Sequence, residues 1–406
     1  MTIDTEILVA GGGLNGLSLA LALRSGGFRV VLVDPIPSNS RKSNDFDGRS
    51  YALSIASQRV LSTLGVWDDL AEFQPILGIK VTDGRVGAGP SPLMLAFDHA
   101  EIEEGPMGFM VQDRHLRPTL MKSAQKQNVN LIEGDAVAAF EADTTGVSVT
   151  LDSGNTLRAK LLIGCDGKAS GVAQTAGIKR TGWGYSQTAL VCAIAHKKPH
   201  NGIAHQYFMP SGPLAILPLT DNRASIVWTE RTGRAEAIQA MDDAGYLAEL
   251  RPRFGNFLGE IGLAGTRFTY PLSLSIASSF VASRVALVGD AAHVVHPIAG
   301  QGLNAGLKDV AALAEVLADA KRRGEDIGRD DVLARYQQWR RFDTTALAMA
   351  TDGFNRLFSN DNPIIRSIRD VGLGVTNAFP ELRRNLIREA AGLTGDLPRL
   401  ARGLPL

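Results

Sequence analysis

The feature that most constrains this chain is a glycine-rich turn between an apolar strand and an apolar helix near the N-terminus. Gly11, Gly13 and Gly16 form the pattern G-x-G-x-x-G within VAGGGLNGLSLALAL. The apolar run before the turn predicts a buried strand, and apolar residues at helical spacing over 17–24 predict a helix after it. A second strand is expected at 29–33. This strand–turn–helix–strand order is a βαβ unit, and it predicts a parallel sheet.

Each glycine of the turn has a physical role when a dinucleotide binds. The first allows the sharp turn, the second lets the backbone approach a diphosphate, and the third lets helix and sheet pack closely. The helix begins at the turn, so its N-terminal N–H groups can hold the diphosphate. Asp34 has the spacing of a residue that accepts hydrogen bonds from ribose hydroxyls, although a turn or capping role would also account for it. The unit alone predicts a dinucleotide but does not distinguish FAD from NAD.

Composition narrows the class of protein further. Glycine provides 43 of the 406 residues, which favours tight turns and close backbone contact with a ligand. Lys+Arg and Asp+Glu both number 42, and this balance argues against a nucleic-acid partner. No apolar run reaches the roughly 18 residues of a membrane-spanning helix, and no signal or transit peptide is visible. We therefore expect a cytoplasmic protein that binds no metal and keeps Cys165 and Cys192 as buried free thiols.

A second glycine cluster lies late in the chain, in RVALVGDAAHVVHPIAGQGLNAGLKDVAAL. A strand is expected at 285–288, a turn at Gly289-Asp290, and a long helix from Gly300-Gln301-Gly302 onward. Asp290 follows the strand and can accept hydrogen bonds from a polyol chain, although a capping role is the alternative. The helix again offers free N–H groups to negative charge on a ligand. Long helices are predicted at 302–317 and 331–349, and a shorter one at 52–64.

The run from His296 to Asp309, HPIAGQGLNAGLKD, resembles the signature of the ubiquinone-biosynthesis hydroxylase (UbiH-like) branch of the class A flavoprotein monooxygenases. Asp47-Gly48-Arg49, followed by Ala52-Leu53-Ser54, resembles the family segment whose arginine lies near the flavin. The run LIGCDG at 162–167 resembles the DG motif, which is associated with FAD and NAD(P)H. The resemblance extends over essentially the whole chain.

Two positions depart from the family pattern. The DG motif usually continues to an arginine, where this chain has Ala173. The branch often has Glu-Asn where this chain has Gln112-Asp113. Gln112 still resembles the glutamine that other class A enzymes place on the FAD.

The resemblance implies an α/β fold of the p-hydroxybenzoate hydroxylase type. A Rossmann-like FAD-binding domain is interrupted by a β-sheet substrate domain, and a helical C-terminus follows. The expected ranges are 1–72, 100–180 and 270–345 for the discontinuous FAD-binding domain, 73–99 and 181–269 for the substrate domain, and 346–406 for the C-terminal helical region.

The resemblance also implies the chemistry. NAD(P)H reduces FAD, the reduced flavin takes up O₂, and a C4a-hydroperoxyflavin hydroxylates an activated aromatic ring. The branch acts on hydrophobic polyprenylated phenols of ubiquinone biosynthesis, which implies peripheral contact with the inner membrane or a place in a multi-enzyme Ubi-type complex. Ile364, Ile365 and Ile368 lie among arginines and predict either an interfacial helix or a solvated helix face. A class A hydroxylase of a small soluble aromatic and a non-catalytic flavoprotein scaffold are the alternatives.

The candidate catalytic residues are Arg49 and His296. Arg49 would clamp flavin or substrate, and His296 would act as the base that activates a phenol, with a structural role as its alternative. Pro297 lacks an N–H and would present its carbonyl beside the flavin ring. The residues expected to bind FAD are Gly11, Gly13, Leu14, Asn15, Gly16, Asp34, Arg49, Gln112, Asp166, Gly167, Asp290, Pro297, Gly300, Gln301, Gly302, Leu303 and Asn304.

Overall fold

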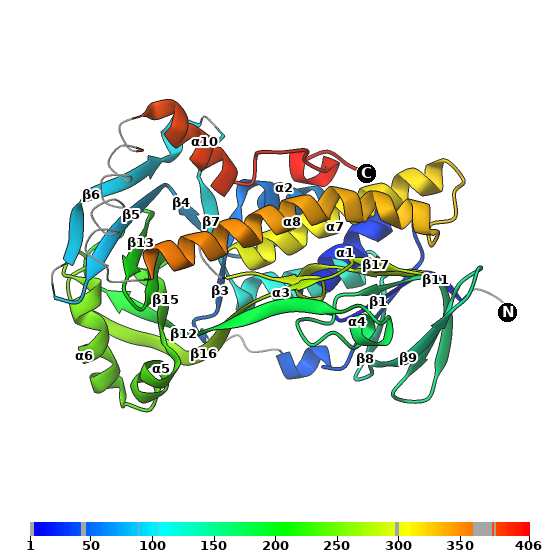
Figure 1. The fold of residues 1–406 in the computed structure, drawn as a ribbon, viewed down its shortest axis with the longest axis horizontal. Coiled ribbons are helices and arrows are strands. Elements are labelled where there is room, and N and C mark those ends of the chain that lie inside the picture. The colour runs from blue at the N-terminus through cyan, green and yellow to red at the C-terminus, as the bar shows by residue number, and fades with distance from the viewer. Residues whose placement is uncertain are drawn as a thin grey trace.

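The computed structural model describes residues 4–41, 46–87, 89–102, 104–296, 300–359, 376 and 379–406. Three β-sheets form the framework of this part of the chain, and helices pack around them (Figure 1). The first sheet has the order β17-β18-β11-β1-β2-β8, with β10 and β9 added beside β11. Its strands are β1 (Thr5–Ala10), β2 (Val30–Asp34), β8 (Asn130–Glu133), β9 (Val137–Ala142), β10 (Val147–Leu151), β11 (Thr156–Gly164), β17 (Val281–Ala282) and β18 (Val285–Leu287).

The predicted βαβ unit is confirmed. β1 pairs in parallel with both β2 and β11, and α1 (Leu14–Ser25) connects β1 to β2. The turn between them is too tight for side chains at two of its glycines. A Cβ on Gly16 would lie 1.8 Å from the carbonyl oxygen of Gly11, and one on Gly11 would lie 2.5 Å from that of Cys165. Gly13 differs, because a Cβ there would meet nothing within 4 Å.

The second sheet is mainly antiparallel and has the order β19-β16-β12-β15-β14-β13-β5-β6. One of its faces packs through Leu190, Ile226 and Trp228 against α5 (Thr232–Gln239) and α6 (Asp243–Phe254). Because side chains alternate along a strand, the other face is left to line a cavity. Its strands are β5 (Gly78–Arg85), β6 (Gly89–Asp98), β12 (Arg180–His196), β13 (Ile203–Met209), β14 (Gly212–Leu219), β15 (Arg223–Arg231), β16 (Ile261–Ala277) and β19 (His293–Val294).

The prediction of a helix at 52–64 was wrong for its first three residues. Residues 52–54 belong to β3 (Ser50–Ser54), which pairs with β7 (Gly108–Gln112), and β4 (Gln74–Ile76) completes this third sheet. α2 (Ile55–Thr63) starts only after Ser54, whose side chain accepts a hydrogen bond from the backbone N–H of Ser57. The pairing with β7 is long-range and leaves no signal in the local sequence.

Both long helices predicted after residue 300 are confirmed and extend further than expected. α7 (Gln301–Arg322) packs beside α1, and α8 (Asp330–Phe358) runs across the molecule from the first sheet towards the second (Figure 1). The interfacial helix predicted around Ile364 lies outside the described residues. The remaining helices are α3 (Asp113–Lys126), α4 (Gly171–Thr175), α10 (Pro380–Ala390) and the short 3-10 helices Ser38–Arg41, Trp67–Asp69, His99–Glu101, Gly289–Ala291 and Arg399–Arg402.

The predicted domain boundaries stay a prediction. β16 crosses the expected boundary between residues 269 and 270 as one continuous strand. No helix in the described ranges is long and apolar enough to span a bilayer.

The glycine turn gives a direct test of the fold. We expect Gly16→Ala to lower the free energy of unfolding by about 2–3 kcal/mol, because overpacking at a rigid backbone contact has this cost. Gly13→Ala is the matched control and should cost less, about 1 kcal/mol or below, because a Cβ there meets no atom within 4 Å and only the N-cap preference for glycine is lost. Denaturant unfolding of both variants measures the difference. Equal stability of the two variants would contradict the close contact at Gly16.

Candidate active site

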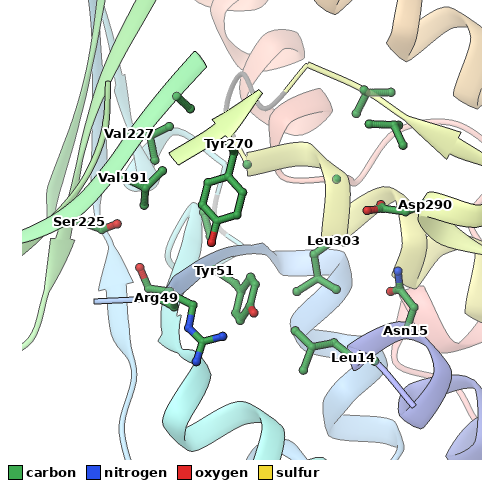
Figure 2. Close-up of a pocket in the computed structure, with 18 of the residues that line it drawn as sticks. Leu14, Asn15, Arg49, Tyr51, Val191, Ser225, Val227, Tyr270, Asp290 and Leu303 are labelled. Carbon is green, nitrogen blue, oxygen red and sulfur yellow. The ribbon is translucent and has the colours of Figure 1, made fainter. Parts of the chain in front are cut away.

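A cavity of about 560 Å³ lies between the first sheet and the exposed face of the second (Figure 2). Residues from both glycine clusters meet there, although they are separated by most of the chain. Its lining comprises Gly13, Leu14, Asn15, Arg49, Ser50, Tyr51, Ala52, Arg117, Cys165, Gly167, Ala189, Val191, Gln206, Ala215, Leu217, Ser225, Val227, Tyr270, Leu272, Val288, Asp290, Val294, Val295, Gly300, Gly302 and Leu303.

Two helices begin at this cavity with uncapped N-termini. α1 is preceded by Gly13 and α7 by Gly300, and neither helix has a side-chain cap or an acidic residue in its first turn. Gly300 has a φ of 65°, a conformation that favours glycine. The N–H groups of both helix ends are therefore available to a ligand that carries negative charge.

Asp34 lies beneath the glycine turn rather than on the cavity wall. One carboxylate oxygen accepts from the backbone N–H of Gly12 at 2.5 Å, and the other accepts from that of Ile36 at 2.7 Å. A Cβ on Gly12 would meet this carboxylate, which explains the third consecutive glycine.

Asp290 points into the cavity from the 3-10 turn after β18 (Figure 2). Its side chain is accessible from the cavity but is otherwise surrounded by protein, and this burial raises the pKa of its carboxyl, with His293 and Arg180 opposing the rise. Arg180 also donates to the backbone oxygen of Asp290 at 3.2 Å. Arg180 thus fixes the backbone of Asp290, and the carboxylate remains at the cavity as a hydrogen-bond acceptor.

A buried cluster of charged residues fixes the turn that carries Asp290. Asp309 of α7 accepts from the backbone N–H of Gly289 at 3.0 Å and lies 2.6 Å from Nε2 of His293. Arg340 of α8 donates to its other oxygen at 2.8 Å. Burial opposes ionisation of Asp309, but the charges of His293 and Arg340 hold its pKa below the usual value. The packing of α8 on α7 therefore determines where Asp290 lies.

Arg49 reaches the cavity from the start of β3 and is held by acidic neighbours. Its Nε donates to Asp47 at 2.7 Å, and its guanidinium lies 3.8 Å from Asp113. Tyr51 donates to Asp113 at 2.7 Å, and Arg117 donates to both oxygens of the same carboxylate. Burial raises the pKa of Asp113, but these donors outweigh it and keep the pKa low. This edge of the cavity therefore carries two arginines whose charges are balanced by Asp47 and Asp113.

The opposite wall comes from the second sheet and is mostly apolar. Val191 and Val227 project from adjacent strands, and Tyr270 of β16 directs its hydroxyl into the cavity (Figure 2). Sequence reasoning missed Tyr51, Tyr270 and this wall. Strand alternation could have indicated the wall only if it had been known which face packs against α5 and α6.

Several residues expected to touch FAD are engaged elsewhere. The Gln112 amide oxygen accepts from Arg114 at 2.7 Å, and the residue does not line the cavity. The Asn304 oxygen accepts from Ser54 and Ser57, so it ties α7 to α2. Asp166 accepts from the N–H of Val172 at 3.1 Å, while its Oδ1 is buried without a partner in the described structure. Gly11, Gly16 and Gln301 lie beside the cavity without lining it, and Pro297 lies outside the described residues.

His296 is completely buried and does not line the cavity. Its ring packs edge-on against Tyr185 at 5.1 Å, and neither ring nitrogen has a hydrogen-bond partner among the described residues. Burial lowers its pKa to about 4, although the charge of Asp352 opposes this. The structure thus places His296 behind the wall as a neutral side chain.

The two cysteines are free thiols, but only Cys192 is fully buried. Cys165 is partly accessible because it lines the cavity beside the glycine turn, which corrects the expectation of two buried thiols. Burial raises the pKa of both, for Cys192 to about 11.

The donors and the shape of the cavity fit FAD. Open space at Gly13 beside an uncapped helix suits a diphosphate, and Asp290 suits a ribityl chain. Asn15 has a buried Oδ1 without a partner in the described structure, and Gly289 and Gly306 leave the space that its amide occupies. These features are typical of a flavin-binding protein. The apolar wall of the second sheet lies across the cavity from them.

Comparisons with known proteins agree with this class. The chain matches the FAD binding domain family over residues 4–351. Ubiquinone hydroxylase UbiL of Rhodospirillum rubrum is 43% identical over 406 residues, covering 99% of this chain and 93% of the relative. The 3-demethoxyubiquinol 3-hydroxylase of Escherichia coli is 35% identical, covering 96% and 99%. The solved structure of p-nitrophenol 4-monooxygenase PnpA from Pseudomonas putida shares the fold at a TM-score of 0.80 and 21% identity, covering 97% and 99%.

The molecule is therefore an FAD-dependent monooxygenase with the predicted α/β fold. More closely, the chain belongs to the ubiquinone-biosynthesis hydroxylase family, and the expected family, enzyme class and FAD cofactor are confirmed.

The burial of His296 predicts a pH dependence of stability. Its folded pKa is about 4 and its unfolded pKa about 6.5, so the unfolded state binds a proton first as the pH falls. The stability tied to neutral His296 is present above pH 6.5 and is lost towards pH 4, by about 3 kcal/mol. His296→Gln should reduce the change of unfolding free energy with pH over this window. His99→Gln, at the surface, is the control and should leave that pH dependence unchanged. An unchanged slope for His296→Gln would contradict a neutral buried imidazole.

Proposed function

We propose that this enzyme hydroxylates the aromatic ring of a polyprenylated phenol in ubiquinone biosynthesis, using FAD, NAD(P)H and O₂. The observation that supports it most is one cavity that joins two uncapped helix N-termini to a largely apolar sheet wall. An anionic, flavin-like ligand suits the first part, and a hydrophobic ring with its prenyl chain suits the second. Two relatives that cover nearly the whole chain are named ubiquinone hydroxylase UbiL and 3-demethoxyubiquinol 3-hydroxylase, which favours this substrate class.

The residues of the chain have distinct roles in this proposal. The N-terminus of α1 holds the diphosphate, Asp290 accepts from the ribityl hydroxyls, and the N-terminus of α7 favours negative charge on the flavin ring. Bound FAD supplies the activation of dioxygen. Arg49 stabilises an anionic oxygen at the cavity edge, and the sheet wall excludes water from the ring. His296 supports this wall from behind rather than acting as the base.

Quinone analysis tests the function directly. A strain that lacks this enzyme, and any redundant hydroxylase, should accumulate a prenylated precursor with one oxygen fewer than the normal intermediate. The complemented strain grown under isotopically labelled dioxygen should incorporate the label at that ring position. A normal quinone profile in the deletion strain would refute the proposal, and it would favour the small-aromatic or scaffold alternative.

Asp290 provides a residue-level test of flavin binding. Asp290→Ala removes the cavity-facing acceptor, so the purified variant should contain several-fold less FAD than wild type. Asp152→Ala, in an exposed turn, is the control and should retain full FAD. Flavin absorbance relative to protein absorbance measures both. Full flavin content in Asp290→Ala would refute the ribityl role.

We further propose that the outer face of α8 contacts an anionic lipid surface. Phe342 is 78% and Met349 72% exposed, and they lie seven residues apart on one face of the helix. Leu357, eight residues after Met349, is exposed towards the same side, and Phe354 is exposed next to it. At the end of α8, Arg356 lies over the ring of the exposed Trp183 at 5.3 Å. Apolar side chains bordered by tryptophan and arginine are typical of segments that lie at the surface of anionic membranes.

Vesicle sedimentation tests this contact. We expect Phe342→Ser with Met349→Ser to reduce co-sedimentation with anionic phospholipid vesicles several-fold, because about 25 cal/mol of transfer free energy is lost for each Å² of apolar surface. Ile36→Ser removes an exposed apolar side chain elsewhere and should have no effect. Equal sedimentation of the double variant and wild type would exclude α8 as the contact.

A further inference from the structure

We propose that Ser225 and Gln206 hold the oxygen substituents of the aromatic substrate and thereby determine its specificity. The inference rests on the proposed function, because it assigns residues to the ring that this function requires. Both side chains project from the sheet wall, where their neighbours Val191, Leu217 and Val227 are apolar.

Ser225 is a buried hydroxyl directed into the cavity. The residue is 3% exposed and lies on β15, whose flanking residues Ala224 and Ile226 pack into the core on the opposite face. Figure 2 shows its oxygen on the cavity side of the strand. A hydroxyl in an apolar wall costs free energy unless it finds a hydrogen-bond partner. Because the hydroxyl lies on the cavity side, a ligand oxygen in the cavity can form that hydrogen bond.

Gln206 presents an amide from β13 to the same cavity. Its neighbours His205 and Tyr207 point to the other side of the sheet, where they line a separate cavity. The Nε2 of Gln206 is buried and has no hydrogen-bond partner among the described residues. Because the protein does not fix this amide, rotation by half a turn can present either its oxygen or its N–H groups to a ligand.

The sheet register sets the distance between the two side chains. Gln206 lies opposite Ala215 of β14, and Ala215 lies opposite Val227 of β15. Ser225 lies two residues before Val227 on β15 and on the same face. It is therefore two strands across and two residues along from Gln206. At about 4.8 Å between strands and 3.3 Å per residue, the two Cα atoms are roughly 12 Å apart. One aromatic ring with oxygens on opposite sides can lie between them and form a hydrogen bond to each.

The competing explanation is that Ser225 and Gln206 matter only for the shape of the wall. Shape and hydrogen bonding are separable, because Ser225→Ala and Gln206→Met keep the volume nearly constant while they remove the polar atoms. Tyr207→Phe is the matched control, since it removes a hydroxyl from the same strand but on the opposite face.

The test is anaerobic titration of the FAD-loaded enzyme with 2-prenylhydroquinone and with prenylbenzene, followed by the change in flavin absorbance. Wild type should bind the hydroquinone more tightly than the ring without oxygens. Ser225→Ala and Gln206→Met should each weaken hydroquinone binding by about tenfold, the effect of one lost hydrogen bond. Neither should change the affinity for prenylbenzene, and Tyr207→Phe should match wild type with both probes.

The outcomes separate this assignment from the proposed function. If wild type binds neither probe, the proposed substrate class is wrong and the assignment falls with it. If wild type prefers the hydroquinone and both variants retain that preference, the substrate class stands and the assignment is overturned. Equal weakening with both probes would indicate a change of shape and would also overturn it. Ser225→Gly replaces Ser225→Ala if the latter purifies without flavin.

Discussion

The close backbone contact at the glycine turn is the constraint on which the rest of the site depends. Gly11 and Gly16 let β1, α1 and the end of β11 approach until carbonyl oxygens occupy the positions of absent Cβ atoms. Because α1 begins at this contact, its uncapped N–H groups have a fixed place at one end of the cavity. The turn is therefore both a close backbone contact and the part of the cavity whose N–H groups can complement an anionic ligand.

A buried ionic cluster supports the opposite side of the flavin-binding region. His293 comes from β19, Asp309 from α7 and Arg340 from α8, and Asp309 lies within hydrogen-bonding distance of both other residues. Removing water from such groups costs free energy, which only their mutual contacts offset. The cluster stabilises one geometry of the loop, and that loop carries Asp290 to the cavity. The packing of α8 on α7 thus positions a residue that lines the cavity.

Much of the fold was predictable because it rests on local patterns. The βαβ unit, both glycine clusters and the two long helices each have a characteristic spacing within a few residues. The error at residues 52–54 arose because β3 forms only by pairing with a distant strand. Motif position alone was also insufficient for Gln112 and Asn304, whose amides already bind protein groups. Whether a polar side chain is free for a ligand depends on neighbours that the motif does not contain.

The sequence by itself determined that this chain binds a dinucleotide through backbone at glycine turns, and its resemblance to a family identified the ligand as FAD. Only the tertiary structure decided which side chains line the cavity. Alternation along β13 and β15 places Gln206 and Ser225 on a different face from His205 and Ile226, but it does not say which face is covered. The packing of α5 and α6 on one side of the sheet makes that choice, because it buries Trp228 and leaves the other side open to the cavity.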